Sequence, residues 1–199
     1  MKEIRKLDLQ FRTKEDTEKM QIEGYAVVFN SPETYDYTEI IDEHALDNTD
    51  MSDVVLRYNH NDSFMVLART RNKSLELNVD EKGLMIDATL QDNITDHRNI
   101  YNAIKSGLID KQSFAFTVEE DEYDYDTDTR TIKKIGKLFD VSVVDQPFYN
   151  STDVSVKSEN DEFLAKRKEL REEHEKQIEE EKKQEELRKL KDSLIEKLG

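Results

Sequence analysis

The chain has 199 residues, a hydrophobic fraction of 35% and a formal net charge of −16 at pH 7. Its length suits one domain with an appendage, and its hydrophobic fraction lies below the roughly 45–50% of globular domains. Because clustered Lys and Arg dominate binding to nucleic acid and to anionic membranes, the acidity argues against both partners. The absence of cysteine excludes disulfides, thiol catalysis and Cys-ligated zinc.

No apolar run approaches the ~20 residues that span a bilayer, and the start of the chain has no apolar segment typical of a signal peptide. We therefore expect a soluble, cytosolic protein.

Short runs rich in β-forming residues dominate positions 1–160. Several alternate between apolar and polar residues, as strands with one buried face do, and turn signals separate them. The expected strands cover residues 4–11, 20–29, 54–58, 74–79, 84–90, 113–118 and 131–144. One helix interrupts them, with Thr95 or Asp96 as its cap and Gly107 at its end. Closely spaced strands with few helices predict a mainly β fold, an antiparallel barrel or sandwich.

The stretch 119–128 holds seven acidic residues in ten. It lacks the Gly and the closing Glu of an EF-hand calcium loop. We expect a solvated hairpin loop between the flanking strands.

Residues 161–198 are predicted to form one long, charged helix. The segment 161–199 contains 13 acidic and 11 basic residues, no Pro, and Gly only at its end. Glu and Lys or Arg recur at spacings of three and four, which favours an exposed helix. Its apolar positions are too few for a coiled coil, so a solvated tail and a partner-binding or dimerising helix both remain open. The expected domains are therefore 1–157 and 158–199.

The sequence offers few candidates for chemistry. It has no HxxxH or HExxH pair and no GxGxxG or GxxxxGK(S/T) loop, so neither a metal nor another cofactor is expected. His60 ends an apolar strand and Ser113 begins another, and a serine nucleophile needs a neighbouring imidazole. On spacing alone, however, a strand-end His and a turn Ser are the commoner interpretation.

Six segments, in their order and spacing, resemble the prohead (capsid maturation) proteases of tailed bacteriophages, relatives of the herpesvirus assemblin proteases. Residues 104–116 resemble the I-x-x-G-x-I-x-x-x-S-F-G-F segment of the nucleophile, with Ala115 in place of the usual Gly. Residues 138–147 resemble L-x-E-V-S-x-V-x-x-P, with Asp140 in place of Glu. The other matching segments are 24–30, 39–46 (with His44 where Gly is usual), 55–61 and 75–84.

The resemblance implies an antiparallel β-barrel of the herpesvirus-protease type, followed by the long charged helix. It also implies a serine endopeptidase in which Ser113 is the nucleophile, His60 the general base and Asp140 the third member of the triad, with Asp145 as the alternative third member. The implied substrates and partners are the capsid protein, a scaffold protein and the chain itself, inside the immature capsid in the bacterial cytoplasm. Self-association is a further expectation.

A rival hypothesis needs no triad. A catalytically silent β-domain that carries a helical assembly tail would be a scaffolding protein. A protease requires His60 and Ser113, whereas a scaffold does not.

Overall fold

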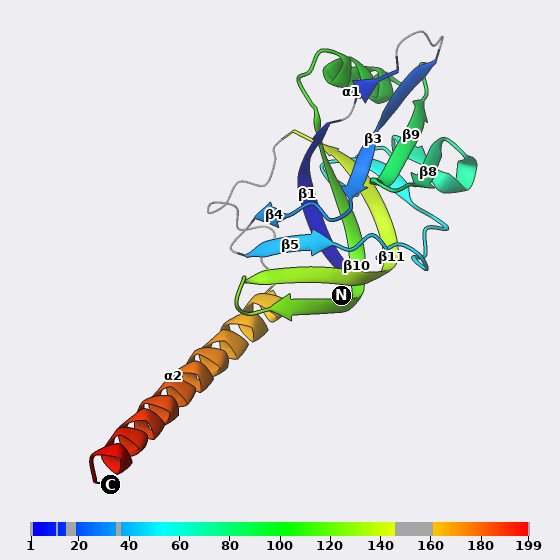
Figure 1. The fold of residues 1–199 in the computed structure, drawn as a ribbon. Coiled ribbons are helices and arrows are strands. Elements are labelled where there is room, and N and C mark those ends of the chain that lie inside the picture. Colours follow the sequence, from blue (N-terminus) through cyan, green and yellow to red (C-terminus); the bar gives the residue numbers. More distant parts are fainter. Residues whose placement is uncertain (1, 11, 15–18, 35–36, 146–160, 199) are drawn as a thin grey trace. The chain divides into compact units, whose positions relative to one another are not determined.

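The structure, a computed structural model, describes residues 2–10, 12–14, 19–34, 37–145 and 161–198. Its chain divides into two compact units, Met1–Asp153 and Val154–Gly199. The fold is mainly β (Figure 1). Strands make up 45% of it, and the described residues also form two α-helices and a short 3-10 helix, Thr70–Asn72. The predicted domain boundary at 157/158 lies outside the described residues and stays a prediction.

The larger sheet has seven strands, in which β10 and β11 form a long central hairpin. On one side β10 pairs with β1, and on the other side β11 pairs with β5 near its start and with β6 near its end. Its strands are β1 (Lys2–Gln10), β4 (Glu33–Thr34), β5 (Thr38–Ile41), β6 (Val55–Tyr58), β7 (Ala68–Arg69), β10 (Lys111–Asp124) and β11 (Thr129–Val144). Because β5 and β6 run parallel to β11, the expectation of a purely antiparallel sheet is wrong.

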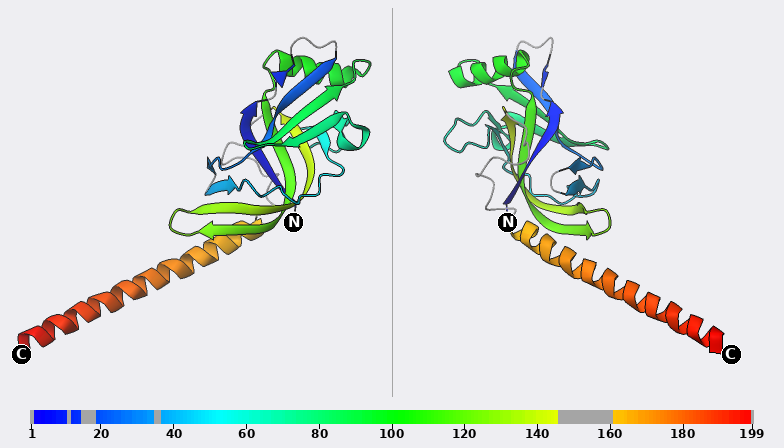
Figure 2. Two further views of the ribbon diagram at one scale, coloured as in Figure 1. Left: turned by 45° about the vertical axis from the view of Figure 1, so that its right-hand side comes forward. Right: turned by 90° about the vertical axis from the view of Figure 1, so that its left-hand side faces the viewer.

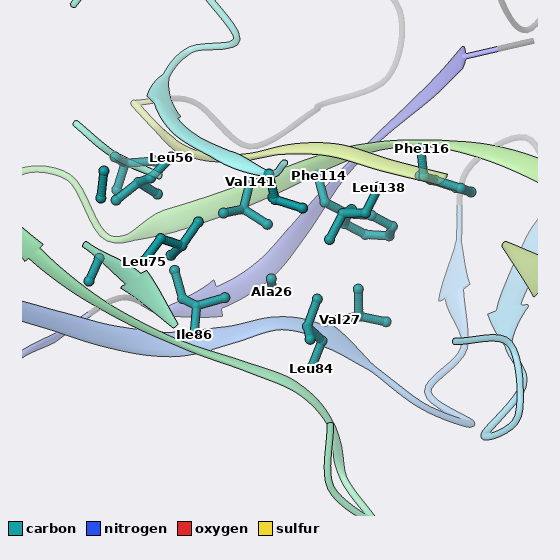
Figure 3. Close-up of a cluster of buried hydrophobic side chains, with 14 of the residues drawn as sticks. Ala26, Val27, Leu56, Leu75, Leu84, Ile86, Phe114, Phe116, Leu138 and Val141 are labelled. Carbon is teal, nitrogen blue, oxygen red and sulfur yellow. The ribbon is translucent and has the colours of Figure 1, made fainter. Parts of the chain in front are cut away.

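The smaller sheet is antiparallel, in the order β2-β3-β9-β8. It contains β2 (Arg12–Thr13), β3 (Met20–Val28), β8 (Leu75–Val79) and β9 (Gly83–Leu90). Its apolar face supplies Ala26, Val27, Leu84 and Ile86 to the core, opposite Phe114 and Val141 of the larger sheet (Figure 3). These side chains are fully buried. Alternation predicts this for Leu84 and Ile86, whereas the consecutive residues Ala26 and Val27 are both buried beside the irregular register between Tyr25 and Val27.

Each of the seven predicted runs corresponds to a strand; the ends differ by one or two residues, except that β10 continues to Asp124, six residues beyond the predicted end. The strand pairings among the described residues make two sheets and do not close them into a barrel. The mainly β prediction is therefore confirmed, and the barrel stays a prediction.

The predicted helix between strands is α1 (Thr95–Lys105). It ends as expected, because Gly107 takes a left-handed backbone (φ +73°) and its N–H donates to the Ile104 carbonyl. The predicted cap is wrong: Ile94 is the N-cap residue and makes no side-chain cap, while Thr95 already lies inside the helix.

The acidic stretch is a hairpin, but most of it is strand. Strand β10 continues to Asp124 and β11 starts at Thr129, so the expected loop 119–128 is wrong over its first six residues. The opposite strand is basic: Lys134 pairs with Glu119 at 2.7 Å and Arg130 with Asp121 at 2.6 Å. These cross-strand ion pairs allow an acidic sequence to extend the sheet.

The predicted C-terminal helix is α2 (Asp161–Leu198), one uninterrupted helix in both views of Figure 2. Ion pairs one turn apart support it, including Lys183–Glu179 at 2.9 Å and Lys189–Glu185 at 2.8 Å. Within the described part of the chain, no helix has the length and apolar character needed to cross a membrane.

Replacing Gly83 with alanine is expected to destabilise the smaller sheet strongly. Gly83 has φ +155°, and a Cβ there would overlap the Val27 carbonyl of the neighbouring strand. Strain and overlap together should lower the free energy of unfolding by about 3 kcal/mol or more. Gly107→Ala is the matched control, because a Cβ at Gly107 meets no atom within 4 Å and only its backbone (φ +73°) is strained, at about 1–2 kcal/mol. Urea unfolding of both variants tests the prediction, and equal losses would contradict it.

Candidate active site

Two neighbouring strands and the end of a third bring the predicted residues together. Ser113 of β10 lies directly opposite Ser142 of β11. Because side chains alternate along a strand, Asp140 shares the face of Ser142. Strand β6 runs parallel to the same part of β11 and ends at Tyr58, two residues before His60.

The backbone after β6 turns the imidazole towards this face. Asn59 and His60 both adopt left-handed conformations, with φ of +52°. The Asn59 N–H still donates to the Val143 carbonyl at 2.9 Å, and the His60 N–H then donates to the Ser142 hydroxyl at 3.3 Å. Two consecutive left-handed non-glycine residues are uncommon, and such conformations concentrate at functional sites.

The three predicted residues form a continuous hydrogen-bonded series. His60 Nε2 lies 2.5 Å from Ser113 Oγ, and His60 Nδ1 lies 2.5 Å from Asp140 Oδ1. Ser113 is fully buried and Asp140 is 2% exposed, while the His60 side chain is 10% exposed. The serine and the carboxylate are therefore buried, and the imidazole between them has the largest exposure of the three side chains.

The Asp140 carboxylate selects the tautomer of the neutral imidazole. An ionised carboxylate can only accept, so Nδ1 carries the proton and Nε2 is left to accept from Ser113. Burial alone would raise the pKa of Asp140, but the hydrogen bond and charge of His60, together with Lys2 and Ser142, lower it below the ordinary value. Asp140 therefore stays ionised beside the imidazole.

The Ser113 hydroxyl has a second acceptor. It also lies 2.7 Å from the carbonyl oxygen of Arg5 in β1, the strand that pairs with β10. A hydroxyl has one proton, so Arg5 O and His60 Nε2 compete for it. Attack by Oγ requires that proton to pass to His60.

The alternative third member lies in different surroundings. Asp145 is exposed, follows β11 and accepts from the Tyr58 hydroxyl at 2.9 Å. Asp140 is the carboxylate within hydrogen-bonding distance of His60 Nδ1, even though it is one methylene shorter than the Glu of the resembling motif.

Sequence reasoning did not single out Ser142 or the Arg5 carbonyl. Ser142 lies two residues after Asp140 in a predicted strand, so period-two alternation was a usable signal. Nothing in the sequence could have identified the Arg5 carbonyl, because every residue has a backbone carbonyl. Among the described residues, no group of three or more His, Asp or Glu side chains is arranged to hold a metal ion.

A serine, a histidine and a buried carboxylate in hydrogen-bonding series form the arrangement by which serine hydrolases of the triad type are recognised, whatever their fold. Comparison with protein families matches residues 7–166 to the family described as Caudovirus prohead serine protease. The chain therefore belongs to this family of phage capsid-maturation proteases. Comparisons with curated proteins and with solved structures found no match.

Proposed function

We propose that the chain is a serine endopeptidase in which Ser113 is the nucleophile, His60 the general base and Asp140 the residue that orients His60. The observation that carries the proposal is the series Ser113 Oγ–His60 Nε2 and His60 Nδ1–Asp140 Oδ1, with 2.5 Å at both contacts. Membership of a family described as a serine protease supports the reaction class.

The geometry supports an acyl-enzyme mechanism. As Ser113 Oγ attacks the scissile carbonyl carbon, His60 Nε2 takes the hydroxyl proton. Asp140 stabilises the imidazolium that forms, and His60 then gives the proton to the leaving amine. Water attacks the acyl-enzyme by the same route and frees Ser113.

The proposed substrates are the scaffold protein or the scaffolding segment of the capsid protein, and the chain itself. Family membership supports this choice, because a prohead protease implies association with capsid or scaffold proteins inside the immature capsid. The long exposed helix α2 is proposed to bind scaffold or shell. Residues 1–157 are proposed as the protease domain and 158–199 as its tail.

The test is co-expression with the capsid and scaffold proteins of the same phage. The wild-type chain is expected to shorten one of them, as seen by intact mass, whereas Ser113→Ala and His60→Ala leave both at full length. Circular dichroism should show that both variants remain folded. Processing by either folded variant would overturn the proposal and favour the catalytically silent scaffolding protein.

A further inference from the structure

We propose that Ser142 is a positioning residue that fixes the imidazole of His60 and the carboxylate of Asp140 relative to each other, an inference that rests on the proposed function. Its hydroxyl contacts three groups of the site. Oγ lies 3.0 Å from Asp140 Oδ1, 3.2 Å from His60 Nδ1 and 3.3 Å from the backbone nitrogen of His60.

The proton count gives each contact a direction. The Ser142 hydroxyl donates its one proton to the carboxylate of Asp140, which can only accept. Its lone pairs then face the backbone N–H of His60 and the Nδ1–H, whose shorter hydrogen bond goes to Asp140. The hydroxyl is thus satisfied in the one tautomer that leaves Nε2 free to accept from Ser113.

The same hydroxyl holds the uncommon backbone of His60. With φ of +52° at both Asn59 and His60, the turn after β6 needs fixed partners for its N–H groups. The Asn59 N–H has the Val143 carbonyl, and the His60 N–H has Ser142 Oγ. Ser142 therefore connects the turn that carries the base to the strand that carries the carboxylate.

Because these groups are buried, losing their hydrogen bonds would be costly, and the bonds therefore hold the imidazole in one orientation. Ser142 is fully buried, and Asp140 is 2% exposed. Without the Ser142 hydroxyl, the buried carboxylate of Asp140 and the backbone N–H of His60 would each lose a hydrogen-bond partner. The imidazole would then sample orientations in which Nε2 no longer points at Ser113, and a displacement near 1 Å can cost about 100-fold in rate.

The experiment uses full-length capsid protein, obtained by co-expression with Ser113→Ala so that it stays unprocessed. Its cleavage by the purified full chain gives kcat and KM for the wild type, Ser142→Ala, Ser142→Cys and Ser142→Thr. We expect Ala and Cys to lower kcat about 10- to 100-fold with little change in KM. Cys fills the space of the serine hydroxyl with a larger but weakly hydrogen-bonding sulfur, so a loss in both variants cannot come from a cavity. Thr keeps the hydroxyl and is expected to recover most of the rate.

Ser74→Ala is the matched control, because the Ser74 hydroxyl also bridges polar groups, accepting from the Arg69 N–H at 2.9 Å, but outside the site. Its kcat should stay at the wild-type value. Wild-type kcat in folded Ser142→Ala or Ser142→Cys, beside an inactive Ser113→Ala, would overturn the positioning role and leave the proposed function intact. Equal cleavage by the wild type and Ser113→Ala would instead overturn the proposed function.

Discussion

Asp140→Asn is expected to lower kcat for cleavage of the capsid protein by about 10⁴-fold, the scale of the corresponding change in other Ser-His-Asp enzymes. The amide can turn an N–H towards His60 Nδ1, which favours the tautomer with the proton on Nε2. That nitrogen can then no longer accept the Ser113 proton across the 2.5 Å contact. Rates measured with the full chain and unprocessed capsid protein provide the test.

Asp145→Asn is the matched control, because Asp145 is also a carboxylate at this end of the sheet but accepts from the Tyr58 hydroxyl. We expect its kcat to stay within about threefold of wild type, in line with a surface substitution outside the proton relay. A larger loss in Asp145→Asn than in Asp140→Asn would transfer the role of third member to Asp145.

The ionised carboxylate of Asp140 should also affect how the stability of the folded chain depends on pH. Because the pKa of Asp140 is lowered in the folded chain, its contribution is complete above the ordinary aspartate value of about 3.9 and is lost as the pH falls through the lowered value. Asp140→Asn should therefore flatten the acid side of the stability curve.

Local patterns predicted the longer strands and both α-helices, because each depends on neighbours in sequence, whereas the short strands β2, β4, β5 and β7 were not predicted. Alternation located β9, and charge spacing located α2 with the observed ends. The parallel pairing of β5 and β6 with β11 was not predicted, because nothing in the sequence of such short strands identifies the strand with which they pair. Residues 119–124 were expected to form a loop but form a strand, because the lysines and the arginine that offset their charge lie on the opposite strand, β11.

The site was predictable only in part for the same reason. His60 and Ser113 are ordinary residues on spacing alone, and the resemblance of ordered motifs singled them out. The choice between Asp140 and Asp145 depended on which carboxylate shares a face with Ser113, a cross-strand relation that the sequence leaves open. The Arg5 carbonyl depends on the register of β1 against β10, which the side chains of neither strand specify alone.

Arg130→Met is expected to destabilise the domain by about 3–5 kcal/mol, because it leaves a buried charge unbalanced. Arg130 of β11 contacts Glu3 of β1 at 2.9 Å and Glu39 of β5 at 3.2 Å, and all three side chains are less than 10% exposed. Arg5 completes the cluster, paired with Glu3 at 2.5 Å and with Glu39. Two arginines and two glutamates balance one another, so removing one arginine leaves the carboxylates in excess.

Urea unfolding of matched variants tests this balance. Lys134→Met removes an exposed partner of Glu119 and should hardly change the urea concentration at the midpoint of unfolding. Arg130→Met with Glu3→Gln restores equal numbers of buried charges and should be more stable than Arg130→Met alone. If the single variant is as stable as Lys134→Met, the cluster does not hold the strands together.

The cluster is also linked to the nucleophile, because the Arg5 side chain belongs to the cluster while the Arg5 carbonyl accepts from Ser113.

Burial alone would raise the pKa of Glu3, but the hydrogen bonds and charges of Arg130 and Arg5 lower it. Its stabilising contribution is therefore complete above the ordinary glutamate value of about 4.3 and is lost in acid. Acid should loosen β1 in the wild type, and in Arg130→Met this loosening should begin at higher pH, since one of the two cations that lower the pKa is gone. Hydrogen exchange of the β1 amides across this pH range measures the shift, and identical profiles for the two proteins would contradict it.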